Sequence, residues 1–187
     1  RAWAAHPPPG AADLLVSDRA AARRVRLVIV GAGFSGIGLA IRLRQQGIED
    51  FVLPERAQAL GGTWRDNSYP GCACDVQSTL YSCSFAPNPD WSHVFSPQPE
   101  IWAYLQRCAE RFDVTRHMVF GQDVTGAVWD DESHRWDVTS SGGRWSAELL
   151  VLANGPLSDP VIPDIPGLDR FAGPRFHSSQ WDPAHPL

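Results

Sequence analysis

Three glycines early in the chain have the type and spacing that bind the phosphates of a dinucleotide. Gly31, Gly33 and Gly36 follow the G-x-G-x-x-G pattern. The first permits a tight turn, the second lets the backbone approach a pyrophosphate, and the third lets a helix pack closely on the preceding strand. Glu55 follows about 20 residues later, where its carboxylate can accept hydrogen bonds from both ribose hydroxyls. Because this carboxylate would repel a 2′-phosphate, the pattern favours FAD or NAD over NADP.

The glycines can act in this way only if a strand precedes them and a helix follows. The apolar run over residues 25–30 predicts a strand buried on both faces of a parallel sheet. Residues 35–46 predict an amphipathic helix, whose N-terminus points its free N–H groups at the phosphates. A second strand is expected over residues 50–53. We expect it to stop at Pro54, which has no N–H to donate, so that Glu55 extends from its end. A glycine-rich turn that binds no ligand is the alternative.

The segment over residues 56–96 has little periodicity and is too long for an ordinary loop. Its many aromatic residues argue against disorder, so we expect an ordered loop that covers the ligand, with a turn or short helix over residues 77–81. A helix is predicted next, because apolar residues recur at helical spacing over residues 101–112. Ser96 is the expected cap of this helix, and one of the two prolines after it suits the first turn.

Short strands are expected after this helix. The last three of the following four form a small antiparallel meander: residues 117–120, 124–129, 135–140 and 144–147. Residues 149–153 predict another doubly buried strand, which ends at Asn154 and Gly155 near the ligand. The predicted fold is therefore α/β, a Rossmann-like dinucleotide-binding domain with a parallel sheet plus a small antiparallel β-meander.

The composition argues against several classes of function. The net charge of −5 over 187 residues gives no basic surface for nucleic acid. No apolar run approaches the ~20 residues that a membrane helix requires, and no secretory signal is visible. The cysteines lack the spacing of a disulfide framework or a zinc site, so we expect no metal site and a reducing, cytoplasmic location. These cysteines are Cys72, Cys74, Cys83 and Cys108.

Several further motifs point to one family. They are Gly61-Gly62-Thr63-Trp64, Tyr69-Pro70-Gly71 with Asp75, Asn154-Gly155, and Phe171-x-Gly173-x3-His177-x3-Trp181-Asp182. The last pattern is the most specific, because it fixes five positions over a short span. With the glycine motif and Glu55, these motifs make the chain resemble the N-terminal part of class B flavoprotein monooxygenases, and most closely the Baeyer–Villiger monooxygenases, from residue 25 to the C-terminus. One departure is Asn154, which stands where the family has threonine.

The resemblance implies a role for each matching residue. The glycine loop would hold the FAD pyrophosphate, Glu55 the adenosine ribose, and Val124 would place its backbone near the adenine. Two residues would serve catalysis: Asp75 close to the flavin ring, and His177 as a residue that couples the linker to domain movement after NADPH binds. The full set implied to contact FAD is Gly31, Gly33, Phe34, Ser35, Gly36, Glu55, Arg56, Gly62, Thr63, Trp64, Asp75, Val76, Tyr81, Val124, Asn154 and Gly155.

The resemblance also implies an activity. FAD reduced by NADPH would react with dioxygen to give a C4a-peroxide, which would convert a ketone or aldehyde to an ester or lactone. The chain would comprise a mobile N-terminal extension (1–24), an FAD-binding domain (25–156) and a linker (157–187) toward an NADP-binding domain that lies beyond it. We therefore expect no turnover from this chain alone. The alternatives are an N- or S-oxygenating flavin monooxygenase and a non-catalytic, truncated dinucleotide-binding module.

Overall fold

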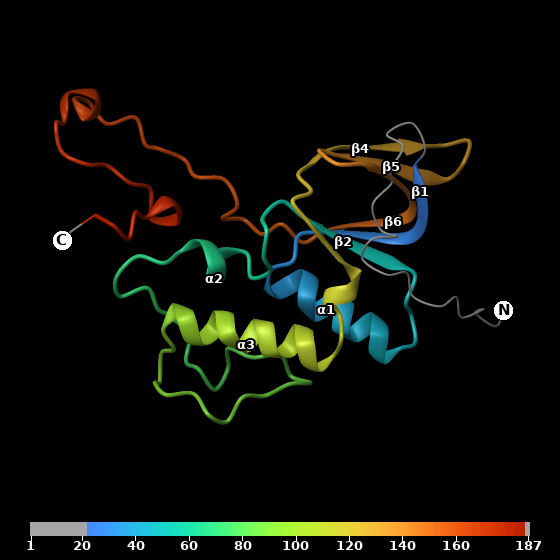
Figure 1. The fold of residues 1–187 in the computed structure, drawn as a ribbon, viewed down its shortest axis with the longest axis horizontal. Coiled ribbons are helices and arrows are strands. Elements are labelled where there is room, and N and C mark those ends of the chain that lie inside the picture. Colours follow the sequence, from blue (N-terminus) through green and yellow to red (C-terminus); the bar gives the residue numbers. More distant parts are fainter. Residues whose placement is uncertain (1–21, 186–187) are drawn as a thin grey trace.

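The computed structural model describes residues 22–185, so the extension expected over residues 1–24 lies largely outside the described residues. Within this part of the chain, one sheet contains six strands: β1 (Arg23–Val30), β2 (Phe51–Glu55), β3 (Met118–Phe120), β4 (Val124–Asp130), β5 (Arg135–Ser140) and β6 (Arg144–Leu152). Their order is β3-β2-β1-β6-β5-β4 (Figure 1). The neighbouring strands β3, β2, β1 and β6 run parallel to one another, whereas β5 pairs antiparallel with both β6 and β4. The sheet is therefore mixed, and its parallel half is Rossmann-like.

The turn between β1 and α1 (Phe34–Gln45) confirms the predicted strand–turn–helix. Gly31 has φ +101°, a conformation that glycine adopts at little cost. A Cβ added to Gly36 would lie 2.0 Å from the carbonyl oxygen of Gly31, closer than any side chain permits. Both glycines are therefore required by the backbone itself, one for the turn and one for the close approach of the helix.

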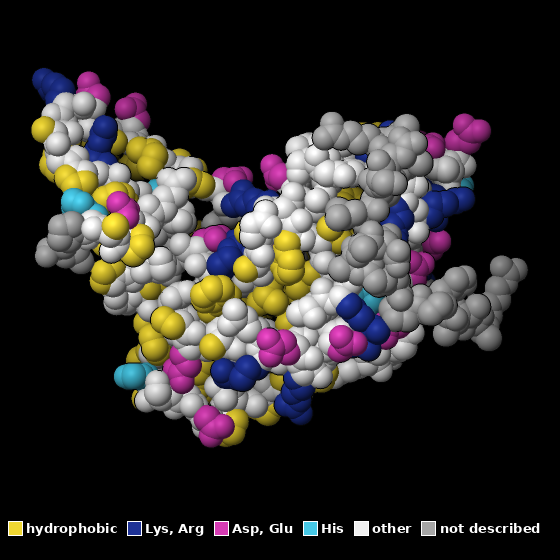
Figure 2. Space-filling model, in the orientation of Figure 1, with side chains coloured by type: hydrophobic (Ala, Val, Ile, Leu, Met, Phe, Trp, Pro, Cys, Tyr) yellow, Lys and Arg dark blue, Asp and Glu magenta, His cyan; other side chains and the backbone are white. Residues whose placement is uncertain are grey.

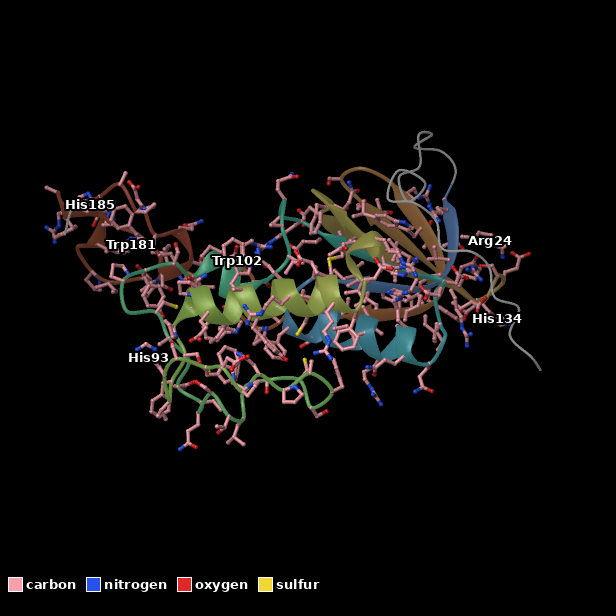
Figure 3. The ribbon with its side chains drawn as sticks, turned by 60° about the horizontal axis from the view of Figure 1, so that its bottom comes forward. Arg24, His93, Trp102, His134, Trp181 and His185 are labelled. Carbon is pink, nitrogen blue, oxygen red and sulfur yellow. The ribbon has the colours of Figure 1, made fainter. Side chains whose placement is uncertain are left out.

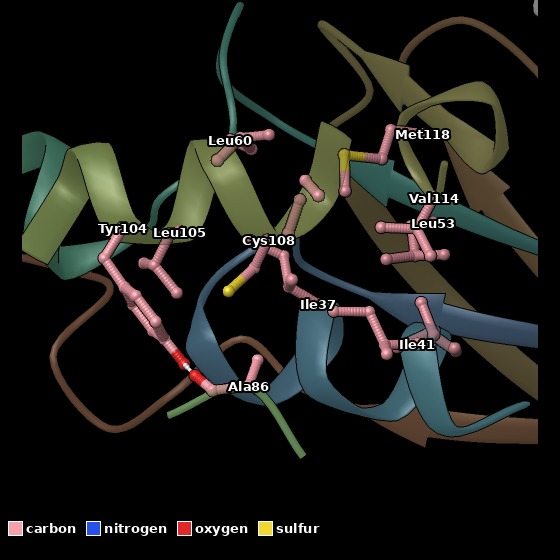
Figure 4. Packing of buried hydrophobic residues seen from close by; sticks show 14 of the residues in the cluster. Ile37, Ile41, Leu53, Leu60, Ala86, Tyr104, Leu105, Cys108, Val114 and Met118 are labelled. Carbon is pink, nitrogen blue, oxygen red and sulfur yellow. Dashed lines mark hydrogen bonds between the residues drawn. The ribbon is translucent and has the colours of Figure 1, made fainter. Parts of the chain in front are cut away.

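Two helices, α1 and α3 (Gln98–Arg111), cover one face of the sheet. Ile37 and Ile41 of α1 belong to one buried cluster with Leu105 and Cys108 of α3. In Figure 4, Ile37 lies toward Cys108, whereas Ile41 lies toward Leu53 and Val114 of the same cluster. Full burial of a side chain such as Ile or Leu contributes roughly 1.5–3 kcal/mol. Apolar packing between the helices and the sheet therefore fixes their positions.

The expected cap of α3 was wrong by one residue. The cap position is occupied by Pro97, and Pro99 lies in the first turn. Ser96 does not cap the helix, because its Oγ is hydrogen-bonded to Ser78 Oγ at 2.6 Å. The hydroxyl is thus used to hold the segment before the helix, and no side chain caps α3.

The predicted meander is present, but it is not separate from the parallel sheet. β6 is one strand, which pairs with β5 over its first half and with β1 over nearly its whole length. A second core between the two halves of the sheet joins Val28 and Val52 of the parallel strands to Val138 and Trp145 of the meander. The meander therefore covers the face of the sheet opposite the helices.

Two details of the strand predictions were also wrong. β2 continues through Pro54 to Glu55, because these two residues pair with Val119 and Phe120 of β3, beyond the end of the ladder between β1 and β2 at Val52. The end of β6 is not buried on both faces, and Leu152 is 70% exposed. Val151 of β6 packs against the core between the sheet and the two helices, but Leu152, the next residue, lies outside that core.

The long segment after β2 is ordered, as expected. It contains the short helix α2 (Thr63–Asp66), which the sequence pattern did not reveal, and a turn over residues 77–81 in which the N–H groups of Leu80 and Tyr81 donate to the Gln77 carbonyl. An isolated bridge between Ala73 and Pro97 ties the segment to the start of α3.

Beyond β6, the chain leaves the sheet and extends away from it as a tail (Figure 1). The tail contains two 3₁₀ helices, Leu168–Arg170 and Ser178–Gln180, and the second lies near α2. Many of its apolar side chains, including Val161 and Phe171, are exposed. Among the described residues, no helix has the length and apolar character needed to cross a membrane.

Candidate functional site

A cavity of about 470 Å³ opens where β1, β2 and β6 end, outside their carboxyl ends. Parallel α/β sheets bind their ligands in this crevice. Figure 2 shows basic and acidic side chains close together around the recess between the tail and the body of the molecule. The cavity is lined by Val30, Gly31, Gly33, Phe34, Ser35, Glu55, Arg56, Gly62, Thr63, Trp64, Arg65, Asp66, Tyr81, Gln122, Asp123, Val124, Leu152, Ala153, Asn154, Gly155, Pro156, Leu157, Ser158 and Asp159.

The N-terminus of α1 opens into this cavity. No side chain caps the helix and no acidic residue lies in its first turn, so the first N–H groups lack a partner from a capping side chain. Gly33 faces the backbone of Gly62, and a Cβ at Gly33 would have only that glycine, at 3.7 Å, as a neighbour. An uncapped helix end beside bare backbone is a site to which a phosphate group fits.

Glu55 lies on the opposite side of the glycine turn and is 5% exposed. Its Oε2 accepts a hydrogen bond from the Ala32 N–H at 2.8 Å, and its Oε1 accepts from the Ala57 N–H at 3.0 Å. Arg65 Nη1 donates to the same Oε1 at 3.2 Å. A carboxylate offers about four acceptor positions, so these three donors leave about one for a ligand.

Arg65 is a site residue that the sequence reasoning missed. Its guanidinium donates to Glu55 and to Asp66, and it also contacts the carbonyl of Ala59. It therefore neutralises the buried carboxylate while holding the loop between β2 and α2. Its position directly after Trp64 in the predicted ligand-covering loop was the only available signal.

Aromatic side chains form one wall of the cavity. Trp64 Nε1 donates to the Tyr81 hydroxyl at 2.9 Å, and the Phe34 and Tyr81 rings pack edge to face with centroids 5.2 Å apart. Burial raises the pKa of Tyr81, and the nearby Cys74 and Asp75 raise it further, against the effect of the Trp64 hydrogen bond. The rings of this wall pack edge to face, and the indole N–H of Trp64 is already paired with the Tyr81 hydroxyl, so the wall suits contact with another aromatic ring.

α3 positions the loop that carries the second glycine pair. Trp102, labelled in Figure 3, donates from Nε1 to the Leu60 carbonyl at 2.9 Å. Its ring leaves no space at Gly61, where an added Cβ would lie 2.7 Å away. The indole thus sets the path of the backbone that brings Gly62 to Gly33.

The cavity brings together most of the residues expected from the sequence. Four expected residues do not line it: Gly36, Asp75, Val76 and His177. Gly36 serves the packing of α1, and Val76 is 40% exposed. Asp75 is also exposed but lies close enough to Tyr81 to raise the pKa of its phenol. His177 lies in the tail, where its Nδ1 is hydrogen-bonded to Ser179 Oγ at 2.9 Å.

Apart from Arg65, most of the lining residues that were missed are neighbours of predicted ones. They lie at the ends of β1 and β6, before β4, and at the start of the tail: Val30, Gln122, Asp123, Leu152, Ala153, Pro156, Leu157, Ser158 and Asp159, with Asp66 in α2. The rule that ligands bind outside the carboxyl ends of parallel strands could have found those at β1 and β6.

Comparisons with known proteins agree with this geometry. A family model described as an NAD(P)-binding Rossmann-like domain matches residues 29–108. A protein of Streptomyces coelicolor named Baeyer–Villiger monooxygenase is 55% identical over 158 residues, which are 84% of this chain and 30% of that protein. The chain therefore spans about a third of the length of the curated relatives it matches.

Solved structures give the same result. An oxidized steroid monooxygenase bound to NADP has a TM-score of 0.76 and 43% identity, covering 85% of this chain and 31% of the other. A protein named OTEMO, in complex with FAD and NADP, has a TM-score of 0.75 and 36% identity, covering 84% and 31%. By sequence, this chain is therefore similar to proteins named Baeyer–Villiger monooxygenase, of whose length it spans about 30%, and by fold it is similar to monooxygenases of solved structure.

Proposed function

We propose that this chain binds FAD in the cavity at the glycine turn, as part of an NADPH-dependent monooxygenase that inserts oxygen next to the carbonyl of a ketone or aldehyde. The observation that carries the proposal is one juxtaposition: the uncapped N-terminus of α1 and the buried carboxylate of Glu55 face one cavity across the turn at Gly31. The similarity to Baeyer–Villiger monooxygenases and to a structure that contains FAD and NADP supports it.

The residues present fit the two polar parts of FAD. The N–H groups at the start of α1 and the bare backbone at Gly33 and Gly62 suit the pyrophosphate. Glu55 has about one free acceptor position for a ribose hydroxyl. Pairing with the second hydroxyl requires Arg65 to release Oε1, and at 3.2 Å its contact is the longest of the three.

The apolar part fits as well. We assign the flavin half to the wall formed by Phe34, Trp64 and Tyr81, and the adenine to the side of Val124. Asp75 is proposed to act from just outside this wall, and its proximity to Tyr81 supports that position. His177 is proposed to couple the tail to domain movement, which the position of the adjoining 3₁₀ helix near α2 supports.

Bound FAD would supply hydride acceptance from NADPH and the transfer of one oxygen atom of dioxygen to the carbonyl substrate. The described residues bind and orient: the helix end and Glu55 fix the nucleotide, and the aromatic wall excludes water from one side of the cavity. We further propose an FAD-binding domain over residues 25–156, a linker over residues 157–187 and a cytoplasmic location. The free thiols of the cysteines suit a reducing compartment.

NAD is a second candidate for the same cavity, because the matching family model is described as NAD(P)-binding. Each ligand carries a pyrophosphate and an adenosine, so the glycine turn alone does not distinguish them. The aromatic wall favours FAD, because the flavin offers a larger ring system to pack on it.

The test uses the full-length protein and its Gly33→Val variant. The wild-type protein should be yellow and release about one FAD per chain on denaturation, measured by absorbance and by chromatography of the released nucleotide. Gly33→Val should lose most of the flavin, because the side chain occupies the space needed by the pyrophosphate. Gly38→Val is the matched control: it lies within α1, the helix that begins directly after Gly33, and an added Cβ there meets nothing within 4 Å. A colourless wild-type protein that takes up no FAD, or that releases NAD instead, would contradict the proposal.

A further inference from the structure

The first residues of the tail form the outer wall of the cavity. Pro156, Leu157, Ser158 and Asp159 all line it, on the same side as Arg56. Arg56 directly follows Glu55, so any nucleotide whose ribose is held by Glu55 lies next to this wall. The position of the wall therefore affects how easily a bound nucleotide can leave.

Arg56 holds this wall in place. Its Nη1 donates to Asp159 Oδ1 at 2.7 Å, and its Nη2 donates to the carbonyl oxygen of Ser158. Across residues 154–164, all of which the structure describes, the only hydrogen bonds to the rest of the described chain come from Arg56. This segment of the tail therefore depends on one side chain for its polar attachment to the body.

The charges around Arg56 suit a reversible contact. The hydrogen bond to Asp159 raises the pKa of Arg56, as do Asp159, Asp66 and Asp123 through their charges, so the guanidinium remains fully charged. The side chains of Arg56 and Asp159 are 44% and 80% exposed. A pair that is this exposed to water is weak and is screened by salt, so it can open and close without unfolding the domain.

We propose that Arg56 and Asp159 form a latch, which holds residues 156–159 across the cavity and slows the release of the bound dinucleotide. This inference rests on the proposed binding of FAD. Arg56 then acts as a positioning residue: its charge is used by Asp159 and by the Ser158 carbonyl, rather than by a phosphate of the ligand. Asp159, which no motif singles out, becomes a determinant of retention.

The experiment measures FAD release from the full-length protein. Holoenzyme is diluted, and the rate at which free-flavin fluorescence appears is compared for wild type, Arg56→Gln, Asp159→Asn and the double variant. Each single variant should release FAD about three- to tenfold faster, as expected for an exposed ion pair that is reinforced by a hydrogen bond to a carbonyl. The double variant should be no faster than the faster single variant, because both substitutions remove the same interaction.

Asp164→Asn is the matched control, because it removes a carboxylate from the same stretch of tail but makes no hydrogen bond or ion pair with Arg56. Its release rate should equal that of the wild type. Raising the salt concentration should speed release from the wild type and have less effect on Asp159→Asn.

Three results would overturn the latch. Wild-type release from Asp159→Asn would show that the pair holds nothing. Faster release from Arg56→Gln alone would mean that Arg56 contacts the ligand directly, and additive effects in the double variant would show two separate interactions. The failure of the proposed function looks different, since the wild type would then contain no FAD to release. Limited proteolysis of the flavin-free protein gives a second readout: both single variants should be cut faster near residues 156–160 than the wild type and Asp164→Asn.

Discussion

Glu55 makes three hydrogen bonds within the protein, more than a residue that served only to bind a ribose would need. Its two oxygens accept from two backbone N–H groups and from Arg65, at a site that is almost closed to water. The residue therefore joins the glycine turn, the end of β2 and the following loop before any ligand binds. The sequence pattern predicted its position correctly, but not Arg65, because the pairing depends on a loop path that no periodicity encodes.

Glu55→Gln should destabilise the protein even without flavin. The amide NH₂ replaces one carboxylate oxygen and faces an N–H donor, so at least one buried hydrogen bond is lost. We expect the free energy of unfolding to fall by about 1–3 kcal/mol, measured by urea denaturation of the flavin-free protein. Glu148→Gln is the control, because the side chain of Glu148 is 55% exposed and its carboxylate remains open to water in its ion pairs with Arg26 and Arg135. Equal effects of the two substitutions would refute the structural role of Glu55.

His117 predicts a dependence of stability on pH. Its ring is fully buried, stacks on Phe51, and has its Nε2 3.0 Å from Glu49 Oε2 and its Nδ1 3.2 Å from the Phe51 carbonyl oxygen. Burial lowers the pKa of His117 despite these acceptors, and the charge of Arg116 lowers it further. The unfolded chain, with a histidine pKa of about 6.5, then binds the proton more tightly than the folded state.

Stability should therefore be complete above about pH 6.5 and should fall as the pH drops below that value. The check is the urea midpoint at several pH values between about 7.5 and 5.5. His117→Gln should flatten this dependence, whereas His134→Gln, in the exposed turn between β4 and β5, should leave it unchanged. A wild-type midpoint that does not change over this range would disprove the prediction. Glu49, whose pKa its arginine neighbours hold low despite burial, titrates below this window.

Among the elements, the packing of α1 on the turn at Gly31 is the tightest feature of the site. Gly36→Ala should force the helix away from β1, because the added methyl group would lie 2.0 Å from a backbone oxygen. We expect a loss of about 1–3 kcal/mol or more in unfolding free energy.

Gly38→Ala, two residues further along α1, should instead raise the free energy of unfolding. Its added Cβ meets nothing, and alanine favours a helix interior by up to about 1 kcal/mol over glycine. Thermal melts of both variants give the comparison. A Gly36→Ala protein as stable as the wild type would show that the helix can move at no cost.

Elements that are determined by neighbouring residues in the sequence were predicted well. β1, the glycine turn, α1 and β5 have strong local patterns, and each lies within about two residues of its predicted position. The cap of α3 and the end of β2 depended on distant partners, Ser78 for the hydroxyl of Ser96 and β3 for the pairing of Pro54. The short helix α2 gives no periodic signal, because four residues form barely one turn.

At the scale of the whole molecule, the sequence indicated a parallel sheet and a meander, but not that the two form one continuous sheet. β6 appeared to be two strands, because its charged middle at Glu148 interrupts the apolar pattern. Only the paired registers, with β5 on one side and β1 on the other, reveal a single strand. The candidate site was predictable where it lies on motifs, and was missed where the first residues of the tail contact Arg56.

The continuity of β6 has a consequence for how the molecule comes apart. The same strand supplies a partner to β1, which carries the glycine turn, and to the hairpin that closes the second core. The hairpin cannot detach without exposing Val28 and Val52 beneath it. We therefore expect the meander and the candidate site to be lost together on unfolding, so that damage at the rim of the hairpin weakens the cavity at the glycine turn through shared stability.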